Sequence, residues 1–187
     1  MKRNVFTTVA SMLLVAATAQ SSMAQKTSLQ RFGVGYNDLG PTVGVGGIGG
    51  ASASFGARFE HAIKPLPDLG NGTLGFQVAF DYYSWSAGSA GFNYSTRYIP
   101  IGATANYHFK IEGNGQLDPF VGLGLGYNVV TCSYSGAFTG SGSCGYSSGI
   151  YAIGRAGARY FFSPTMAAYG DLGAGGATIN LGVMFKM

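Results

Sequence analysis

Large apolar residues alternate with small or polar residues along most of the chain after residue 30. Residues 120–130 read FVGLGLGYNVV, with large side chains at the odd positions from 121 to 129 and glycine at positions 122, 124 and 126. A period of two predicts a β-strand, because successive side chains of a strand point to opposite faces. One face of this strand would be apolar, and the other would be nearly free of side chains.

The same alternation recurs in eight segments, each about as long as a tilted strand of about ten residues that crosses a membrane. Connections after the second, fourth and sixth segments are rich in turn residues, whereas three of the four after odd-numbered segments are longer or rich in Gly and Ser. Gly40 and Pro41 interrupt the first segment, which leaves open which half is the main strand. The segments are 31–50, 52–63, 73–85, 97–109, 120–130, 149–162, 166–175 and 177–187.

The beginning of the chain has the layout of a secretory signal peptide. Lys2 and Arg3 precede a mostly apolar run that reaches Ala19, and Ser22-Met23-Ala24 offers a small-residue cleavage site. The alternative is a membrane anchor, but the run is short for a helix of about 20 residues. We expect a signal peptide at residues 1–24 and one β-domain at residues 25–187.

The composition favours a membrane protein that crosses the bilayer with strands. Charged residues make up 10% of the chain, against about 25% in a typical soluble domain, and aromatic residues reach 14%. No later segment offers the 18 or more uninterrupted apolar residues of a membrane helix. The chain has no Lys/Arg cluster, and its net charge falls from +4 to +2 if Lys2 and Arg3 are removed with the signal peptide. A nucleic-acid partner is therefore not expected.

Charged residues within the predicted strands indicate which face points inward. A soluble barrel of the lipocalin type has an apolar interior, and three positive and three negative groups are too many for such a core. In an eight-stranded membrane barrel the same groups can form an ionic network across a narrow lumen, which Asn106 and His108 could join. Charges scattered over an ordinary sheet surface are the alternative. The predicted luminal network consists of Arg58, Glu60, Asp81, Arg155, Arg159 and Asp171.

The glycine face of residues 120–130 fits the same arrangement. Arg155 and Arg159 belong to the neighbouring sixth segment. We expect the glycines to face the lumen and to leave room for these two long side chains.

The two cysteines lie 12 positions apart, at Cys132 and Cys144. Export would bring them into an oxidising compartment, where a disulfide is expected. Two free thiols are the alternative. A metal site is not expected, since no histidine lies near the pair.

The sequence offers little that would support catalysis or cofactor binding. Neither His61 nor His108 lies in a recognisable catalytic motif, so we interpret both as structural. The glycine-rich stretches GLGLGYN and GVGGIGG are not followed by a predicted helix, which phosphate and dinucleotide sites require. We expect the protein not to be an enzyme and to hold no cofactor and no metal.

The signal peptide, the eight amphipathic segments and the closing segment INLGVMFKM together resemble the small bacterial outer-membrane β-barrel family, which includes the OmpA membrane domain, OmpX and the opacity proteins. The resemblance covers residues 31–187 and implies an all-β, eight-stranded, antiparallel, up-and-down transmembrane β-barrel. The closing segment resembles the C-terminal signal of the barrel-assembly machinery, although Lys186 and Met187 follow the aromatic residue. The residues of this signal would be Ile179, Leu181, Val183 and Phe185.

The resemblance also implies a location and partners. The expected location is the outer membrane of a Gram-negative-type envelope, with outer-membrane lipid, lipopolysaccharide and the assembly machinery as partners. The expected role is structural or surface interaction at the cell surface, with a lumen filled by polar and charged side chains. The loop at residues 133–149 is uncharged and rich in Gly, Ser and Tyr, which suits contact with an unknown surface ligand. The alternative is a narrow, porin-like passive pore for ions or small solutes.

Overall fold

The computed structural model describes residues 32–47, 51–89, 92–112, 114–136 and 145–187. The predicted signal peptide and Cys144 lie outside these residues, so the predicted cleavage and disulfide stay predictions. Among the helices in the described ranges, none is long and apolar enough to cross a membrane.

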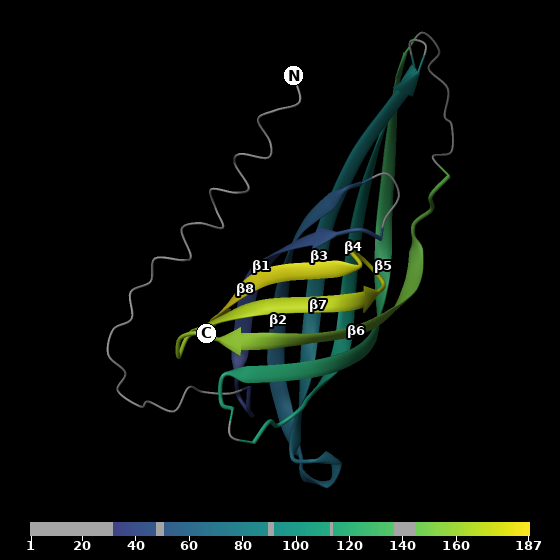
Figure 1. Ribbon diagram of the computed structural model, residues 1–187. Helices are drawn as coiled ribbons and strands as arrows, with labels where there is room; N and C mark the ends of the chain where they lie inside the picture. The colour runs from purple at the N-terminus through teal and green to yellow at the C-terminus, as the bar shows by residue number, and fades with distance from the viewer. Residues whose placement is uncertain (1–31, 48–50, 90–91, 113, 137–144) are drawn as a thin grey trace.

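Eight antiparallel strands form one sheet that closes on itself through pairing between the first and the last strand (Figure 1). Each strand pairs with its neighbours in the sequence, which makes the topology up-and-down. The predicted all-β fold with eight antiparallel strands in a barrel is confirmed. The strands are β1 (Asn37–Val45), β2 (Ala53–Leu66), β3 (Gly72–Ser89), β4 (Phe92–His108), β5 (Leu117–Gly136), β6 (Gly149–Phe161), β7 (Met166–Ala174) and β8 (Ile179–Lys186).

The alternation in the sequence becomes an alternation in burial. Large apolar side chains of β5 and β8 stand on the outer wall, where Leu123 is 75% exposed and Leu181 is 62% exposed. The residues between them point into the barrel, as Asn180 does at 1% exposure. The barrel therefore has an apolar outer wall and a polar, small-residue interior.

Residues near the two ends of the described chain lie at the same end of the barrel, where the β2–β3, β4–β5 and β6–β7 connections have five, eight and four residues. The backbone N–H of Met187 donates to the carbonyl of Asn37 at 3.0 Å. The β2–β3 connection contains the short 3₁₀ helix Pro67–Leu69, and Gly70 after it adopts a left-handed φ of 72°. We call this end the turn end and the opposite end the loop end.

The first strand differs from the expected interruption. β1 runs from Asn37 to Val45 through Gly40 and Pro41, and its pairing with β2 is continuous. Pro41 points outward, and the pairing of β1 with β8 skips Gly40 and Pro41. Proline has no backbone N–H to donate, so the missing ladder contacts fall at the seam where the barrel closes.

At the loop end β3, β4 and β5 extend well beyond the predicted segments 73–85, 97–109 and 120–130, and the small uncharged loop expected at residues 86–95 was largely a wrong prediction. The pairing of β2 with β3 ends at Phe55 and Tyr82, and the pairing of β5 with β6 ends at Asn128 and Gly149. Beyond these points β3, β4 and β5 pair only with one another. We call this three-stranded extension, residues 83–89, 92–98 and 129–136, the raised sheet; it projects from the loop end in Figure 1.

The glycines of β5 accommodate different neighbours from those expected. A Cβ at Gly122 would lie 2.0 Å from the side-chain oxygen of Asn106, and one at Gly126 would lie 2.3 Å from the ring of Tyr151. At Gly124 a Cβ would lie 1.9 Å from the backbone oxygen of Ala103 on β4. The glycines thus make room for Asn106, for Tyr151 and for the neighbouring backbone, and the expected role toward Arg155 and Arg159 is corrected.

Replacing Gly124 with alanine should impair folding, because the new methyl group meets backbone atoms of Ala103 and Thr104 that cannot rotate away. We expect Gly124→Ala to destabilise the barrel by roughly 1–3 kcal/mol. The protein is titrated with urea, and each sample is run on a detergent gel without boiling. The measurement is the fraction that migrates as the folded form. The matched control is Gly154→Ala, where a Cβ would meet only Leu123 Cδ2, at 3.7 Å. Equal folded fractions for the two variants would contradict this account.

Candidate functional site

The barrel interior near the turn end is organised around one arginine. Arg159 of β6 is fully buried. Its Nε donates to Asp38 Oδ2 at 2.8 Å, and its Nη2 donates to Glu60 Oε2. Asp118 Oδ2 lies 3.7 Å from Nη1. The carboxylates come from β1, β2 and β5, so one guanidinium connects strands on several sides of the barrel.

Glu60 is the shared acceptor of this cluster. Its carboxylate accepts hydrogen bonds from Gln77 Nε2 at 3.0 Å and from Asn106 Nδ2 at 2.8 Å. His108 Nε2 lies 2.8 Å from Glu60 Oε1, and His108 Nδ1 lies 3.0 Å from both oxygens of Asp118. Ionised carboxylates only accept hydrogen bonds, so this geometry suits a histidine ring that carries a proton on each nitrogen.

Aromatic rings enclose the same cluster. Phe32, which precedes β1, stacks on His108 with the ring centroids 3.7 Å apart and the planes 13° from parallel. The guanidinium carbon of Arg159 lies 5.1 Å from the ring centroid of Phe32, 5.4 Å from that of Phe120 and 5.5 Å from that of Tyr169. These distances allow cation–π attraction. We call Arg159, Asp38, Glu60, His108, Asp118 and Phe32 the hub.

A second polar cluster lies in the barrel interior on β2, β3, β6, β7 and β8. Arg58 donates two hydrogen bonds to Asp81, at 3.0 Å and 2.9 Å. Asp171 accepts hydrogen bonds from Arg155, from the Tyr169 hydroxyl and from Asn180. Two-point contacts between a guanidinium and a carboxylate hold both groups in a fixed orientation.

The six residues of the predicted luminal network all lie inside the barrel in salt-bridged groups. Arg58 pairs with Asp81, Arg155 with Asp171, and Arg159 with Glu60. The interior also contains acidic groups that the prediction did not include, Asp38 and Asp118. Asp38 lay in the first segment, whose main strand was left open, and Asp118 was assigned to a turn. Phe32 lay in the first predicted segment, but nothing in the pattern indicated its contact with His108 and Arg159.

The other candidate residues lie apart from the interior. His61 is exposed, and its Nδ1 lies 2.7 Å from Asn37 Oδ1. Cys132 lies on β5 in the raised sheet. Within the described ranges, no group of three or more His, Cys, Asp and Glu residues is arranged to hold a metal ion. The residues of the predicted assembly signal belong to β8 and alternate with the inward-pointing Asn180 and Met184; they are Ile179, Leu181, Val183 and Phe185.

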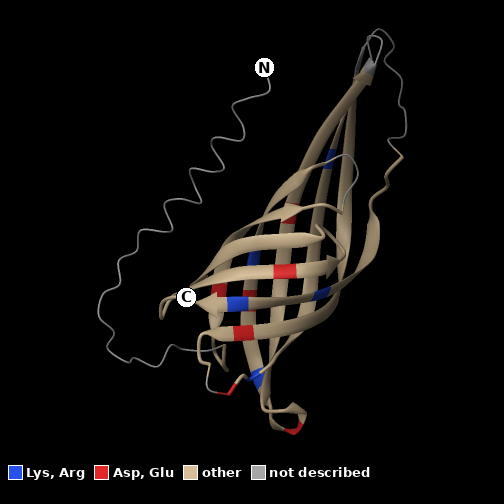
Figure 2. Cartoon of the chain, in the orientation of Figure 1, with Lys and Arg blue, Asp and Glu red and all other residues tan. Residues whose placement is uncertain are grey.

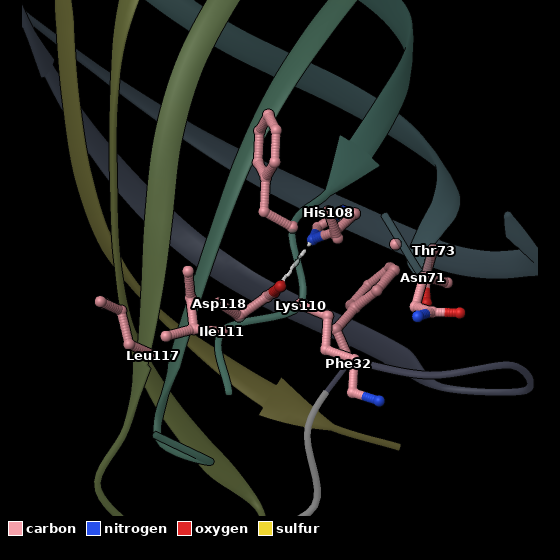
Figure 3. Close-up of a pocket in the computed structure, with 10 residues that line it drawn as sticks. Phe32, Asn71, Thr73, His108, Lys110, Ile111, Leu117 and Asp118 are labelled. Carbon is pink, nitrogen blue, oxygen red and sulfur yellow. Dashed lines mark hydrogen bonds and ion pairs between the residues drawn. The ribbon is translucent and has the colours of Figure 1, made fainter. Parts of the chain in front are cut away.

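A cavity of about 180 Å³ lies at the turn end, next to the hub (Figure 3). Phe32, His108 and Asp118 belong to both the hub and the cavity wall. Asn71, Thr73 near the start of β3, and other residues at this end complete the lining. The hub side chains therefore form one wall of this cavity.

The raised sheet reverses the polarity of the barrel wall. Within the barrel, β3 carries Phe76, Val78 and Phe80 on its outer side, but beyond Tyr82 the same side carries serine. The outer side of the raised sheet holds Ser84, Ser86, Asn93, Ser95, Arg97, Val129, Thr131 and Ser133, and its inner side holds Tyr83, Trp85, Ala87, Tyr94, Thr96, Tyr98, Val130, Cys132 and Tyr134.

Aromatic pairs occur along the inner side of the raised sheet. The rings of Tyr83 and Tyr98 meet edge to face with centroids 6.2 Å apart, and those of Tyr94 and Tyr134 are 6.5 Å apart with an angle of 35°. Tyr146, from the connection that precedes β6, meets Trp85 edge to face at 5.5 Å. The inner side is thus an ordered aromatic surface.

Comparison with solved structures shows the same fold. The chain is similar to the outer membrane protein OprG from Pseudomonas aeruginosa, with 12% identity over 85% of this chain and 99% of that one, and a TM-score of 0.56. It is also similar to the N-terminal β-barrel domain of Pseudomonas aeruginosa OprF, with 16% identity over 83% and 100% of the two chains and a TM-score of 0.52. No protein-family model and no curated protein sequence matches the chain. The fold is that of small bacterial outer-membrane eight-stranded β-barrels.

Removing the Arg159 guanidinium should destabilise the barrel strongly, because Asp38 and Glu60 would remain buried without their main cation. We expect Arg159→Ala to lower the free energy of unfolding by roughly 3–5 kcal/mol. The protein is reconstituted in lipid vesicles and titrated with urea. The measurement is the urea concentration at which half of it no longer migrates as the folded form on a detergent gel. Arg97→Ala removes an exposed arginine of the outer side and should change stability by less than about 0.5 kcal/mol. Similar midpoints for both variants would show that the hub contributes little.

Proposed function

We propose that this protein is an outer-membrane β-barrel with a closed lumen that presents the raised sheet to partners outside the cell. The main observation in support of a closed lumen is the hub, in which the fully buried Arg159 is held between carboxylates of β1 and β2. The proposal combines a structural role in the membrane with surface interaction. A cleaved signal peptide at residues 1–24 would deliver the chain to its location.

The outer wall supports placement in a lipid bilayer. Leu123, Leu125, Ile150 and Leu181 are each more than 60% exposed. A soluble protein seldom exposes a large contiguous apolar surface, whereas an apolar band facing outward is the rule in membrane barrels. The lipid partners would contact this wall, and the outward side of β8 would carry the assembly signal.

The connections support one orientation of the barrel. Outer-membrane barrels have short turns on the periplasmic side and longer loops outside. Both ends of the described chain and the β2–β3, β4–β5 and β6–β7 connections lie at the turn end, whereas the long extension of β3, β4 and β5 lies at the loop end. The raised sheet would then stand on the external side, above the lipid.

The interior supports a closed lumen over a narrow pore. An eight-stranded barrel leaves an interior that side chains can fill. The hub, the pair Arg58–Asp81 and the group around Asp171 occupy this interior at two levels along the barrel. Continuous passage of ions would require these buried pairs to separate, at a cost of several kcal/mol each.

The reconstituted protein should give no stable conductance steps in a planar lipid bilayer, since the hub fills the cross-section. The measurement is single-channel recording at low and high voltage in concentrated salt. An open outer-membrane porin in the same chamber serves as the positive control. Reproducible steps from the folded protein would favour the pore alternative instead.

Surface labelling of intact cells tests the orientation. Ser86→Cys places a thiol on the exposed outer side of the raised sheet, and Asn71→Cys places one at an exposed turn of the other end. A membrane-impermeant maleimide should label Ser86→Cys on intact cells and should label Asn71→Cys only after the outer membrane is permeabilised. The opposite pattern would overturn the assigned orientation.

A further inference from the structure

The inner side of the raised sheet presents partly exposed aromatic rings in an ordered array. Tyr94 is 38% exposed and Tyr134 is 40% exposed, and they are direct cross-strand partners on β4 and β5. Beside them lies the edge-to-face pair of Trp85 and Tyr146. We call Trp85, Tyr94, Tyr134 and Tyr146 the aromatic tip.

Charge is absent around the aromatic tip. The sequence has no charged residue in 83–96 or in 129–149, and Arg97 belongs to the outer side of the sheet. Figure 2 shows the charged residues within the barrel strands, at the turns and lower on the raised sheet, with its far end uncoloured. A polyanion or a strongly charged peptide would find no counter-charge on this surface. The partner that fits is neutral.

The size of the inner side restricts the partner further. β3 contributes seven residues from Tyr83 to Ser89, which at about 3.3 Å per residue span about 23 Å. Three strands at about 4.8 Å spacing are about 14 Å wide, so the surface measures roughly 300 Å². A stable protein interface buries about 800 Å² on each partner. The inner side is too small for a protein domain and suits a short, narrow ligand.

We infer that the aromatic tip binds a neutral oligosaccharide. This inference rests on the proposed function, because the tip must lie outside the cell. Each sugar ring has a face of C–H groups that carry slight positive charge, and the face of an aromatic ring is negative. Hydroxyl groups at the rim of the sugar can exchange hydrogen bonds with the hydroxyls of Tyr94 and Tyr134.

The direction of the inner side identifies the source of the glycan. Lipopolysaccharide of the same membrane would surround the barrel and meet the outer side of the raised sheet, with Ser84, Ser86 and Arg97. The inner side faces the space above the barrel axis, because it continues the face that points into the lumen. The glycan therefore comes from outside the protein's own membrane.

Binding of defined sugars to the folded protein tests the inference. The full mature barrel is placed in phospholipid nanodiscs without lipopolysaccharide and titrated with maltohexaose, cellohexaose and chitohexaose. A heparin-derived hexasaccharide and the core oligosaccharide of lipopolysaccharide are titrated as charged comparisons. Binding is measured by calorimetry and by the fluorescence of Trp85, the only tryptophan in the chain. We expect at least one neutral hexasaccharide to bind and to change the Trp85 fluorescence.

Variants locate the binding surface. Tyr94→Ala and Tyr134→Ala should each weaken binding about tenfold, in line with the loss of one aromatic contact. Tyr82→Ala is the matched control, because Tyr82 is a similarly exposed tyrosine on the outer side of β3. It should change the affinity less than twofold. Migration of the folded form on a detergent gel checks that each variant is folded.

Several results would overturn the inference. These are no binding of any neutral hexasaccharide, binding of the charged sugars alone, or equal affinity of the Tyr134→Ala variant and the native protein. Tip-dependent association of two copies in one nanodisc would overturn it in favour of a second copy as the partner. The conductance and labelling results are independent of these titrations, so the glycan inference can fail while the proposed function stands.

Discussion

The buried guanidinium of Arg159 imposes the constraint on which the rest of the interior depends. Moving a charged group out of water costs several kcal/mol unless partners compensate for it. Asp38, Glu60 and Asp118 supply opposite charge, and Phe32 and Phe120 supply ring faces. Three carboxylates around one guanidinium would repel one another, and His108 lies between Glu60 and Asp118, where a protonated ring reduces this repulsion. The hub is therefore stable only when all its members are present.

The same constraint fixes the register of the strands. A shift of one residue in any strand exchanges its inner and outer faces. For β2 such a shift would move Arg58 and Glu60 to the apolar outer wall and bring Phe59 inside. Each charged residue thus penalises every shift of its own strand by an odd number of residues, and the hub combines β1, β2, β5 and β6 in one arrangement. The ionic interior therefore helps to fix the register of the strands as well as filling the lumen.

The period of two was sufficient to predict eight strands and the inner position of six charged residues, because alternation is a local property of the chain. Features that depend on contacts between distant residues were not predictable in this way. Phe32 lies at the start of the first predicted segment but outside β1, and its place beside His108 depends on the closed barrel. Asp118 was assigned to a turn, because β5 begins earlier than its apolar pattern does. Residues 86–89 and 92–96 have no apolar alternation, yet they extend β3 and β4 because the backbone ladder continues across strands that are already paired.

The raised sheet shows why alternation alone does not reveal the environment of a strand. Along β3 from Gly75 to Ala87 the odd-numbered residues stay on the inner side, and the pairing of β3 with β4 keeps one register. The apolar residues nevertheless change sides near Tyr82, from the outer wall to the inner side. In lipid the outer face must be apolar, and in water it must be polar. The reversal therefore marks the level at which the outer lipid ends on β3. Aromatic residues beyond this level are not explained by contact with lipid, and the proposed partner above the barrel would use their exposed faces.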